Sequence, residues 1–154
     1  TAFIEALARS HRYLLHVRAR RLVTVSEELL LLDHFVTLIS IRYDDGLRVE
    51  LHADPAAARR WLLPPVTLPE LLQNAVKHNE LSSDRPLGVT IRLQGDRLLV
   101  SNERRPKAAA EPSTGLGLEN LARRFRLLSG TPARWGVNGT DFVVSLPLVR
   151  AAPA

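Results

Sequence analysis

Residues 67–79 combine helical spacing with side chains that could hold a metal ion and phosphate groups. Apolar residues recur there at the spacing of a helix face that packs on a core; they are Leu68, Leu71, Leu72, Ala75 and Val76. The opposite face carries Glu70, Asn74, Lys77 and His78. An Asn side-chain oxygen can ligate Mg²⁺, and lysine and histidine can meet phosphate charge. This face predicts a binding site for a metal-bound phosphate, and taken alone it also fits a solvated polar surface.

A second run, residues 113–120, reads Ser-Thr-Gly-Leu-Gly-Leu-Glu-Asn. Gly115 and Gly117 would let the backbone approach a ligand closely, and the helix that follows would point its free N–H groups at that ligand. This arrangement is typical of phosphate binding, although a Gly-x-Gly pair is also found in simple turns that enter a helix. The residues expected to pack this helix on the core are Leu118, Leu121, Ala122, Phe125 and Leu128.

The upstream elements that must position these runs are two further helices, over residues 1–21 and 24–41. The first offers Phe3, Ile4, Leu7, Leu14 and Leu15 as apolar contacts. The second begins with a capping box from Thr24 to Glu27, and Glu27 and Glu28 suit the positive end of the helix dipole. The alternation in residues 47–51 predicts a half-buried strand, with residues 60–63 as a short partner strand.

Strands dominate the second half of the chain. Residues 88–93 and 98–101 read as a hairpin around Gly95-Asp96, and residues 134–137 and 141–146 read as two strands around Asn138-Gly139. Between them lie a stretch rich in proline, alanine and charge at residues 103–113 and a helix from Gly115 to about Gly130. Helices first and mixed elements later predict an α+β sandwich.

Composition narrows the function classes. The chain has 154 residues, 45% of them hydrophobic and 24% charged, as expected for one globular domain. It has no cysteine, which excludes disulfides, thiolate zinc sites and cysteine nucleophiles. The net charge of +5 is spread over scattered basic residues with few aromatic residues near them, so we expect no nucleic-acid partner. The absence of methionine favours a piece of a longer protein.

The two polar runs, in this order, resemble known motifs. Residues 68–79 are similar to the N box of the GHKL ATPase superfamily, residues 113–120 resemble its G2 box, and residues 139–142 resemble its final Gly-Thr strand motif. The flanking pattern resembles more narrowly the LytS-type sensor histidine kinases. That pattern is Arg12-Tyr13, Glu27-Glu28-Leu29, Arg42-Tyr43, Pro64-Pro65 and Leu146-Pro147-Leu148, so the resemblance covers nearly the whole chain.

The resemblance implies a Bergerat fold, a mixed sheet covered on one face by helices, with ATP between the N-box helix and a lid over residues 103–114. It implies that Asn74 ligates the Mg²⁺ that bridges the ATP phosphates. The implied nucleotide-binding residues are Asn74, Lys77, His78, Asn79, Asn102, Gly115, Leu116, Gly117, Leu118 and Thr140. Thr140 would help to hold the adenine. Glu70 matches the catalytic carboxylate of relatives that hydrolyse ATP, and its alternative is a solvated helix carboxylate.

The chain departs from the family pattern at two places. Gln73 stands where the N box usually has glutamate, which removes a charge beside the proposed metal ligand. Asn102-Glu103-Arg104 stands where the G1 box has Asp-x-Gly, whose aspartate accepts a hydrogen bond from the adenine amino group. Asn102 still offers a carbonyl acceptor, and a branch of these kinases carries Val-x-Asn followed by a Pro-Lys pair like Pro106-Lys107. We therefore assign the adenine contact to Asn102.

The expected phosphoacceptor histidine is missing, because the family's Pro-His-Phe motif does not occur in the chain. We interpret His11 and His16 as surface histidines. Residues 1–21 are then the end of the upstream dimerisation helix, residues 22–150 the catalytic domain and residues 151–154 a tail. The resemblance also implies a homodimer in the full-length protein, a response regulator as partner and a cytoplasmic position in a membrane-anchored kinase.

Two other interpretations stay open at the level of sequence. A GHKL-type ATP hydrolase would use Glu70 as a general base. A non-enzymatic dimerisation or docking module with a decayed nucleotide site would explain Gln73 and Asn102, although Asn74 and the two glycines argue for a working site.

Overall fold

The computed structural model describes residues 2–17, 20–108 and 116–152. Its main sheet has five strands in the order β2-β4-β5-β7-β6. Their bounds are β2 (Leu47–His52), β4 (Leu87–Gln94), β5 (Arg97–Glu103), β6 (Arg134–Asn138) and β7 (Asp141–Pro147). Strand β2 runs parallel to β4, and the other neighbours are antiparallel, so the sheet is mixed.

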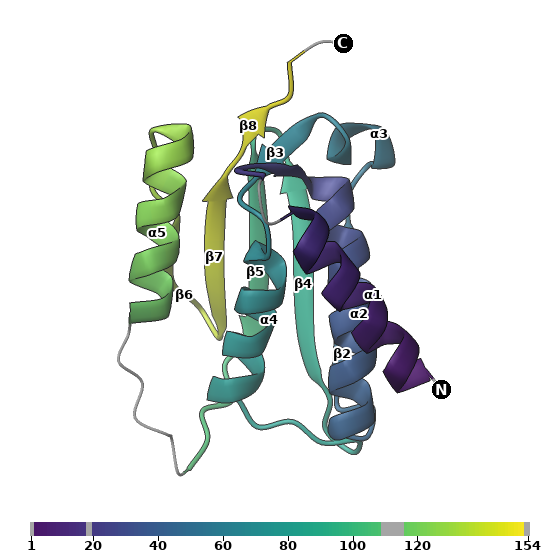
Figure 1. Cartoon of the computed structure of the whole chain (residues 1–154). Helices are drawn as coiled ribbons and strands as arrows, with labels where there is room; N and C mark the ends of the chain where they lie inside the picture. Colours follow the sequence, from purple (N-terminus) through teal and green to yellow (C-terminus); the bar gives the residue numbers. More distant parts are fainter. Residues whose placement is uncertain (1, 18–19, 109–115, 153–154) are drawn as a thin grey trace.

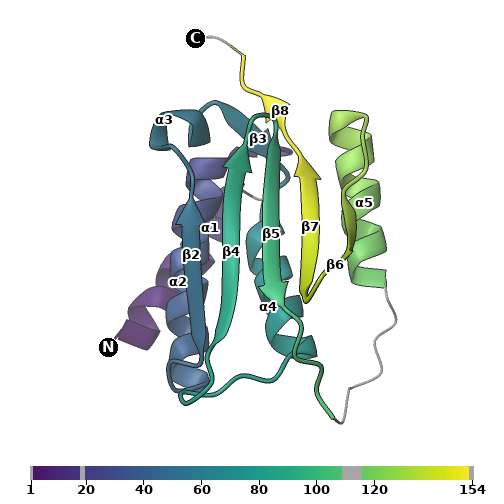
Figure 2. The ribbon, with the colours of Figure 1, turned by 180° about the vertical axis from the view of Figure 1, so that it is seen from behind.

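Helices cover one face of this sheet (Figure 1), and the view from behind shows the strands in front of them (Figure 2). The helices are α1 (Ala2–Val17), α2 (Val25–Arg42), α4 (Thr67–His78) and α5 (Leu116–Ser129), with the short α3 (Pro55–Ala58) beside them. A small second sheet has the order β1 (Val23–Thr24), β3 (Trp61–Leu63) and β8 (Val149–Arg150). The prediction of an α+β sandwich with a mixed sheet under helices is confirmed.

The core lies between the helix layer and the sheet. The apolar stripe predicted for α4 is buried along its whole length: Leu68, Leu71, Leu72, Ala75 and Val76 are all at most 8% exposed. From α5, Leu121 and Phe125 are buried, while Leu118 and Ala122 pack against the core at its margin. Burial of these faces, at about 25 cal/mol per Å² of apolar surface, holds α4 and α5 against the strands.

Helix α2 begins with the predicted capping box. The Glu27 backbone N–H donates to the Thr24 hydroxyl at 3.0 Å, and the Thr24 N–H donates to the Glu27 carboxylate at 3.3 Å. Arg20 donates to the same carboxylate at 2.6 Å. Burial disfavours the charged form of Glu27, but the hydrogen bonds from Arg20 and Thr24 outweigh it and hold the pKa of the carboxyl below its ordinary value.

Glu28 caps a different helix from the one on which it lies. Its buried carboxylate accepts hydrogen bonds from three backbone N–H groups at the start of α4: Val66 at 3.2 Å, Thr67 at 2.6 Å and Leu68 at 3.2 Å. Val66 is the N-cap, has a left-handed φ of 65° and supplies no side-chain cap. The carboxylate of Glu28 therefore satisfies the free N–H groups that α4 would otherwise bury.

Two sequence-based expectations are corrected, and a third falls outside the described residues. Strand β2 pairs with β4 and not with the strand at residues 60–63, because β3 joins β1 and β8 in the small sheet. Phe3, Ile4 and Leu7 of α1 are 46%, 63% and 51% exposed, so they are not core contacts within this chain. The side chains of Leu14 and Leu15 are outside the described part of the structure.

Candidate functional site

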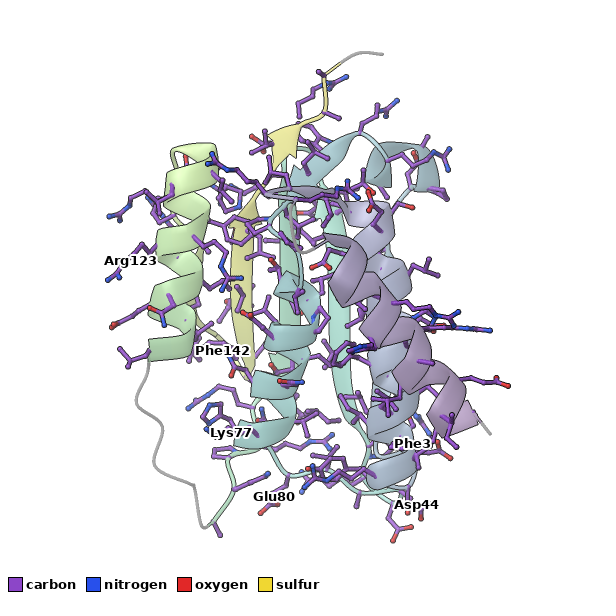
Figure 3. The ribbon with its side chains drawn as sticks, viewed as in Figure 1. Phe3, Asp44, Lys77, Glu80, Arg123 and Phe142 are labelled. Atoms are coloured by element: carbon purple, nitrogen blue, oxygen red, sulfur yellow. The ribbon has the colours of Figure 1, made fainter. Side chains whose placement is uncertain are left out.

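A cavity of about 300 Å³ opens over β5 and β7, with α4 forming one wall and the start of α5 another. Its floor is apolar and consists of Val100, Phe142 and Val144; Figure 3 labels Phe142 between the two helices. The α4 wall supplies Leu71, Asn74, Ala75 and His78, followed by Asn79. The remaining lining residues are Asn102, Arg104, Pro106 and Lys107 after β5, and Gly117 and Leu118 in α5. An apolar floor with a few polar groups at its rim is typical of a small-molecule site.

Asn74 and Gly117 face each other across this cavity. A Cβ atom built on Gly117 would lie 3.9 Å from Nδ2 of Asn74, and no other described side chain outside its immediate neighbours would come within 4 Å. Asn74 is half-buried in the middle of α4, where the buried apolar stripe fixes its direction. The two sequence motifs, which lie on different helices, therefore meet at one place.

Asn102, at the end of β5, is 8% exposed and lines the cavity. Its Nδ2 donates to the Glu103 carbonyl at 2.9 Å. Within the described part of the chain, no group donates to its Oδ1. The side chain thus offers the cavity a hydrogen-bond acceptor, as the sequence suggested.

The segment after Asn102 is fixed to both sides of the cavity. The Arg104 N–H donates to the Thr140 carbonyl at 2.9 Å, and the Arg105 N–H donates to Oδ1 of Asn79 at 2.7 Å. The Arg105 guanidinium donates to Glu103 at 2.9 Å and to the carbonyl of Pro86 at 2.9 Å. Residues 103–107 are therefore an anchored segment and not the start of a free loop. The rest of the expected lid, residues 109–114, is outside the described residues.

Asn79 combines a lining position with a structural role. It is 7% exposed, and its Nδ2 donates to the Ala75 carbonyl at 2.9 Å while its Oδ1 accepts from Arg105. A backbone bridge to Pro106 adds a third tie. Asn79 thus joins the end of α4 to the segment after β5, and its contact with a nucleotide stays a prediction.

Several predicted site residues do not line the cavity. Lys77 is exposed in the last turn of α4 (Figure 3), Leu116 is 53% exposed, and Thr140 is exposed before β7. A carboxylate oxygen of Glu70 lies 3.6 Å from a guanidinium nitrogen of Arg124 in α5, and both side chains are well exposed. Gly115 is outside the described residues. Their proposed roles stay predictions.

The sequence prediction did not include Arg104 and Lys107, which line the cavity. In the sequence, Arg104 stands where the family has a glycine, and Lys107 belongs to the Pro-Lys pair; neither pattern indicated a binding role. None of the lining residues in the described ranges is Asp or Glu. The motifs alone therefore did not indicate that these two cations line the cavity.

Within the described ranges, no three His, Asp or Glu side chains come together to form a metal site, and no helix is long and apolar enough to cross a membrane. Asn74 is one of the lining residues with a side-chain oxygen that could ligate a cation, and its assignment to Mg²⁺ stays a prediction.

Comparisons with known proteins agree with the motifs. No family model matches the chain. Sensor histidine kinase YesM of Bacillus subtilis is 24% identical over 157 residues, which cover 94% of this chain and 27% of YesM. Sensor protein LytS of Staphylococcus haemolyticus is 26% identical over 137 residues, 77% of this chain and 23% of LytS. The resemblance to LytS-type sensor histidine kinases is confirmed.

The chain thus spans about a quarter of the length of these two kinases. Among solved structures, the cytoplasmic segment of histidine kinase QseC matches with a TM-score of 0.59 at 16% identity, covering 97% of this chain and 95% of that one. Full-length histidine kinase ShkA in complex with AMPPNP matches with a TM-score of 0.50 at 20% identity. The match covers 99% of this chain and 37% of the ShkA chain. The chain thus shares the fold of these two structures.

Proposed function

We propose that this chain is the ATP-binding catalytic domain of a sensor histidine kinase, which binds Mg-ATP and donates the γ-phosphate to a histidine on another segment. The observation that carries the proposal is the convergence of Asn74, Asn102 and Gly117 on one cavity. They come from α4, β5 and α5, and each belongs to a motif that the kinase resemblance had singled out. The ShkA structure, a neighbour in fold, holds an ATP analogue.

The adenine would lie on the apolar floor of the cavity. Val100, Phe142 and Val144 offer a flat apolar contact, and Oδ1 of Asn102 can accept a hydrogen bond from an exocyclic amino group. Guanine presents a carbonyl oxygen at the corresponding position, which would face another acceptor. The carbonyl of Glu103 holds the Asn102 amide in this orientation at 2.9 Å, so adenine is the favoured base.

Asn74 is the residue that would hold Mg²⁺, which neutralises phosphate charge when bound. A single protein ligand suits this ion, because Mg²⁺ in nucleotide sites keeps several waters and takes its other ligands from the phosphates. Gln73, the departure from the usual N box, is exposed and is not a lining residue. Its change from glutamate therefore removes no charge from the cavity wall.

The backbone around Gly117 and Leu118 would approach the phosphates, because the N-terminal turn of α5 carries free N–H groups and the positive end of the helix dipole. Phosphoryl transfer is chiefly a matter of positioning and charge neutralisation. The arrangement supports a domain that presents the γ-phosphate at the cavity mouth to a separate acceptor.

Glu70 remains our proposed catalytic carboxylate, acting on the acceptor histidine. Its ion pair with Arg124 is long, at 3.6 Å, and lies on the surface, so an incoming segment can displace it at little cost. A hydrolase would need the carboxylate beside the γ-phosphate, and Glu70 is not a lining residue. This position favours transfer to an approaching histidine over hydrolysis.

The setting in the full-length protein is proposed from the resemblance alone. We expect a homodimer formed through the upstream segment, a response regulator that receives the phosphate, and a cytoplasmic position in a membrane-anchored kinase.

Calorimetric titration with a non-hydrolysable ATP analogue tests the proposal. We expect Mg²⁺-dependent binding with a dissociation constant between micromolar and about 1 mM. Asn74→Ala should weaken Mg²⁺-dependent binding by at least roughly tenfold, because it removes the metal ligand. Gln73→Ala is the matched control, an exposed amide on the same helix, and should bind as the wild type does. Absence of binding at millimolar nucleotide would favour the decayed docking module instead.

A further inference from the structure

We infer that Lys107, together with Arg104, holds the phosphate chain of the bound nucleotide, and that Lys77 does not. The inference rests on the proposed function and deepens it, since it names the cations that recognise a polyphosphate. The N-box resemblance had given this role to Lys77, so the structure and the motif disagree on a point that experiment can decide.

The two lysines of the chain differ in their surroundings. Lys77 is exposed in the last turn of α4 and does not line the cavity, whereas Lys107 is half-buried and lines it. No described carboxylate lies within 4.0 Å of the Lys107 ammonium. A partly desolvated cation without a counter-charge is costly, and an anionic ligand in the cavity would offset that cost.

The cavity has a one-sided charge. Among the lining residues that the structure describes, Arg104 and Lys107 are cationic, and none is Asp or Glu. Arg104 also has no carboxylate within 4.0 Å in the described part of the chain. Arg105, between the two lining cations, forms its ion pair with Glu103 at 2.9 Å and contributes nothing to the lining. The ion-paired residue thus anchors the segment, and the two residues without ion pairs are left for a ligand.

Cations beside the α4 wall would favour a phosphate ligand there. Asn74 and His78 come from its C-terminal half, and the C-terminal end of a helix carries partial negative charge. Cations beside that end offset this charge; α4 carries Lys77 and His78 in its own last turn, and Arg104 and Lys107 add cations that line the cavity. The backbone bridge between Asn79 and Pro106 places the Arg104–Lys107 segment against this end of α4.

The segment is also ordered in advance. Its backbone is held by the Thr140 carbonyl on one side and by Asn79 on the other, at 2.9 and 2.7 Å. With the bridge between Asn79 and Pro106, these ties hold the backbone up to the residue before Lys107, so a ligand that meets Lys107 would have little of the preceding chain left to order.

A ladder of ligands with increasing phosphate number tests the inference: adenosine, AMP, ADP, a non-hydrolysable ATP analogue and inorganic tripolyphosphate. In Lys107→Ala, we expect adenosine affinity to stay within about twofold, and the loss to grow with phosphate number to roughly tenfold or more for the triphosphate and for tripolyphosphate. Lys107→Arg should keep most of the affinity for the triphosphate that Lys107→Ala loses. Arg104→Ala should show the same trend.

Lys77→Ala is the rival variant, and Arg123→Ala, which removes an exposed charge from α5, is the control for net charge. If Lys77→Ala gives the phosphate-dependent loss and Lys107→Ala does not, the inference is wrong while the proposed function stands. If Lys107→Ala weakened the binding of adenosine and of the triphosphate equally, the inference would also be wrong. Lys107-dependent binding of tripolyphosphate without adenosine binding would support the inference and contradict an ATP site. Binding of no ligand by the wild type overturns both.

Discussion

At the scale of single residues, Gly117 separates ligand binding from folding. Its φ is not in the left-handed region, and an added Cβ would meet only Nδ2 of Asn74, at an ordinary 3.9 Å. Because Gly117 is the second residue of α5, alanine should raise the unfolding free energy by up to about 1 kcal/mol. The new methyl group would nevertheless take space where the phosphates are proposed to lie. We therefore expect Gly117→Ala to melt at an equal or higher temperature and to bind the ATP analogue roughly tenfold more weakly.

Gly88→Ala is the matched control, since a Cβ there meets nothing within 4 Å and Gly88 lies in β4, outside the cavity lining. Thermal melting and calorimetry on both variants separate the two effects. If Gly117→Ala bound the ATP analogue as tightly as the wild type does, the glycine run would not be part of the nucleotide site.

From the sequence, the candidate site could be predicted only where a motif marked its residues. Periodicity and motif order selected Asn74, Asn102 and Gly117, and these residues line one cavity. The same reasoning assigned Lys77 to the phosphates and gave Lys107 no role, whereas Lys107 lines the cavity; which of them meets the phosphates stays a prediction. Residues three and four positions after Asn74 are both its neighbours on a helix, and only the docking of α4 on the sheet decides which of them turns to the cavity. That docking puts His78 in the lining and leaves Lys77 out.

At the scale of elements, Glu28 joins α2 to the start of α4. Glu28→Ala would leave three N–H groups without their acceptor, two of them buried and that of Val66 partly buried, around a valine N-cap with φ of 65°. We expect a loss of unfolding free energy of about 3–5 kcal/mol, and a smaller loss of about 1–3 kcal/mol in Glu28→Gln, which keeps one acceptor oxygen. Denaturant unfolding measures both, with the exposed Glu80→Ala as control. A loss below 1 kcal/mol in Glu28→Ala would show that other groups cap α4.

Glu27 should make the start of α2 sensitive to acid. Its pKa is lowered in the folded chain, so its ionised form contributes stability above the unfolded pKa of about 4.3, and this contribution is lost as pH falls through the lower folded pKa. We expect Glu27→Gln to be less stable than the wild type at pH 7, with the difference shrinking below pH 4. Chemical unfolding at a series of pH values checks this. A difference independent of pH would mean that packing, and not charge, stabilises the cap.

The longer elements could be read from periodicity, because a buried stripe such as that of α4 repeats over several turns. The three elements that were missed, β1, α3 and β8, have two to four residues each, too few for any period to be visible. The pairing of β2 with β4 was missed for another reason. Alternation predicts that a strand exists but not its partner, and the parallel pairing of β2 with β4 needs a long crossover connection that alternation does not reveal.

At the scale of the whole molecule, the proposed reaction needs a part that this chain does not supply. The chain spans about a quarter of the two kinases compared above and contains no Pro-His-Phe motif. A phosphoryl group is transferred only when the acceptor atom is held about 3–3.5 Å from it, so nucleotide binding alone gives no product. We therefore expect no acid-labile phosphate on this chain after incubation with Mg²⁺ and γ-labelled ATP.

The same mixture should label a separately supplied histidine-bearing segment of a LytS-type kinase, and Asn74→Ala should abolish that label. Glu70→Gln should lower the rate of labelling while leaving nucleotide affinity within about twofold, because Glu70 is proposed to act on the acceptor and is not a lining residue. Mass spectrometry locates any phosphate. Acid-labile phosphate on His11 or His16 of the chain alone would overturn the assignment of residues 1–21. Steady release of inorganic phosphate, abolished by Glu70→Gln, would instead favour a hydrolase, because water rather than histidine would then be the nucleophile.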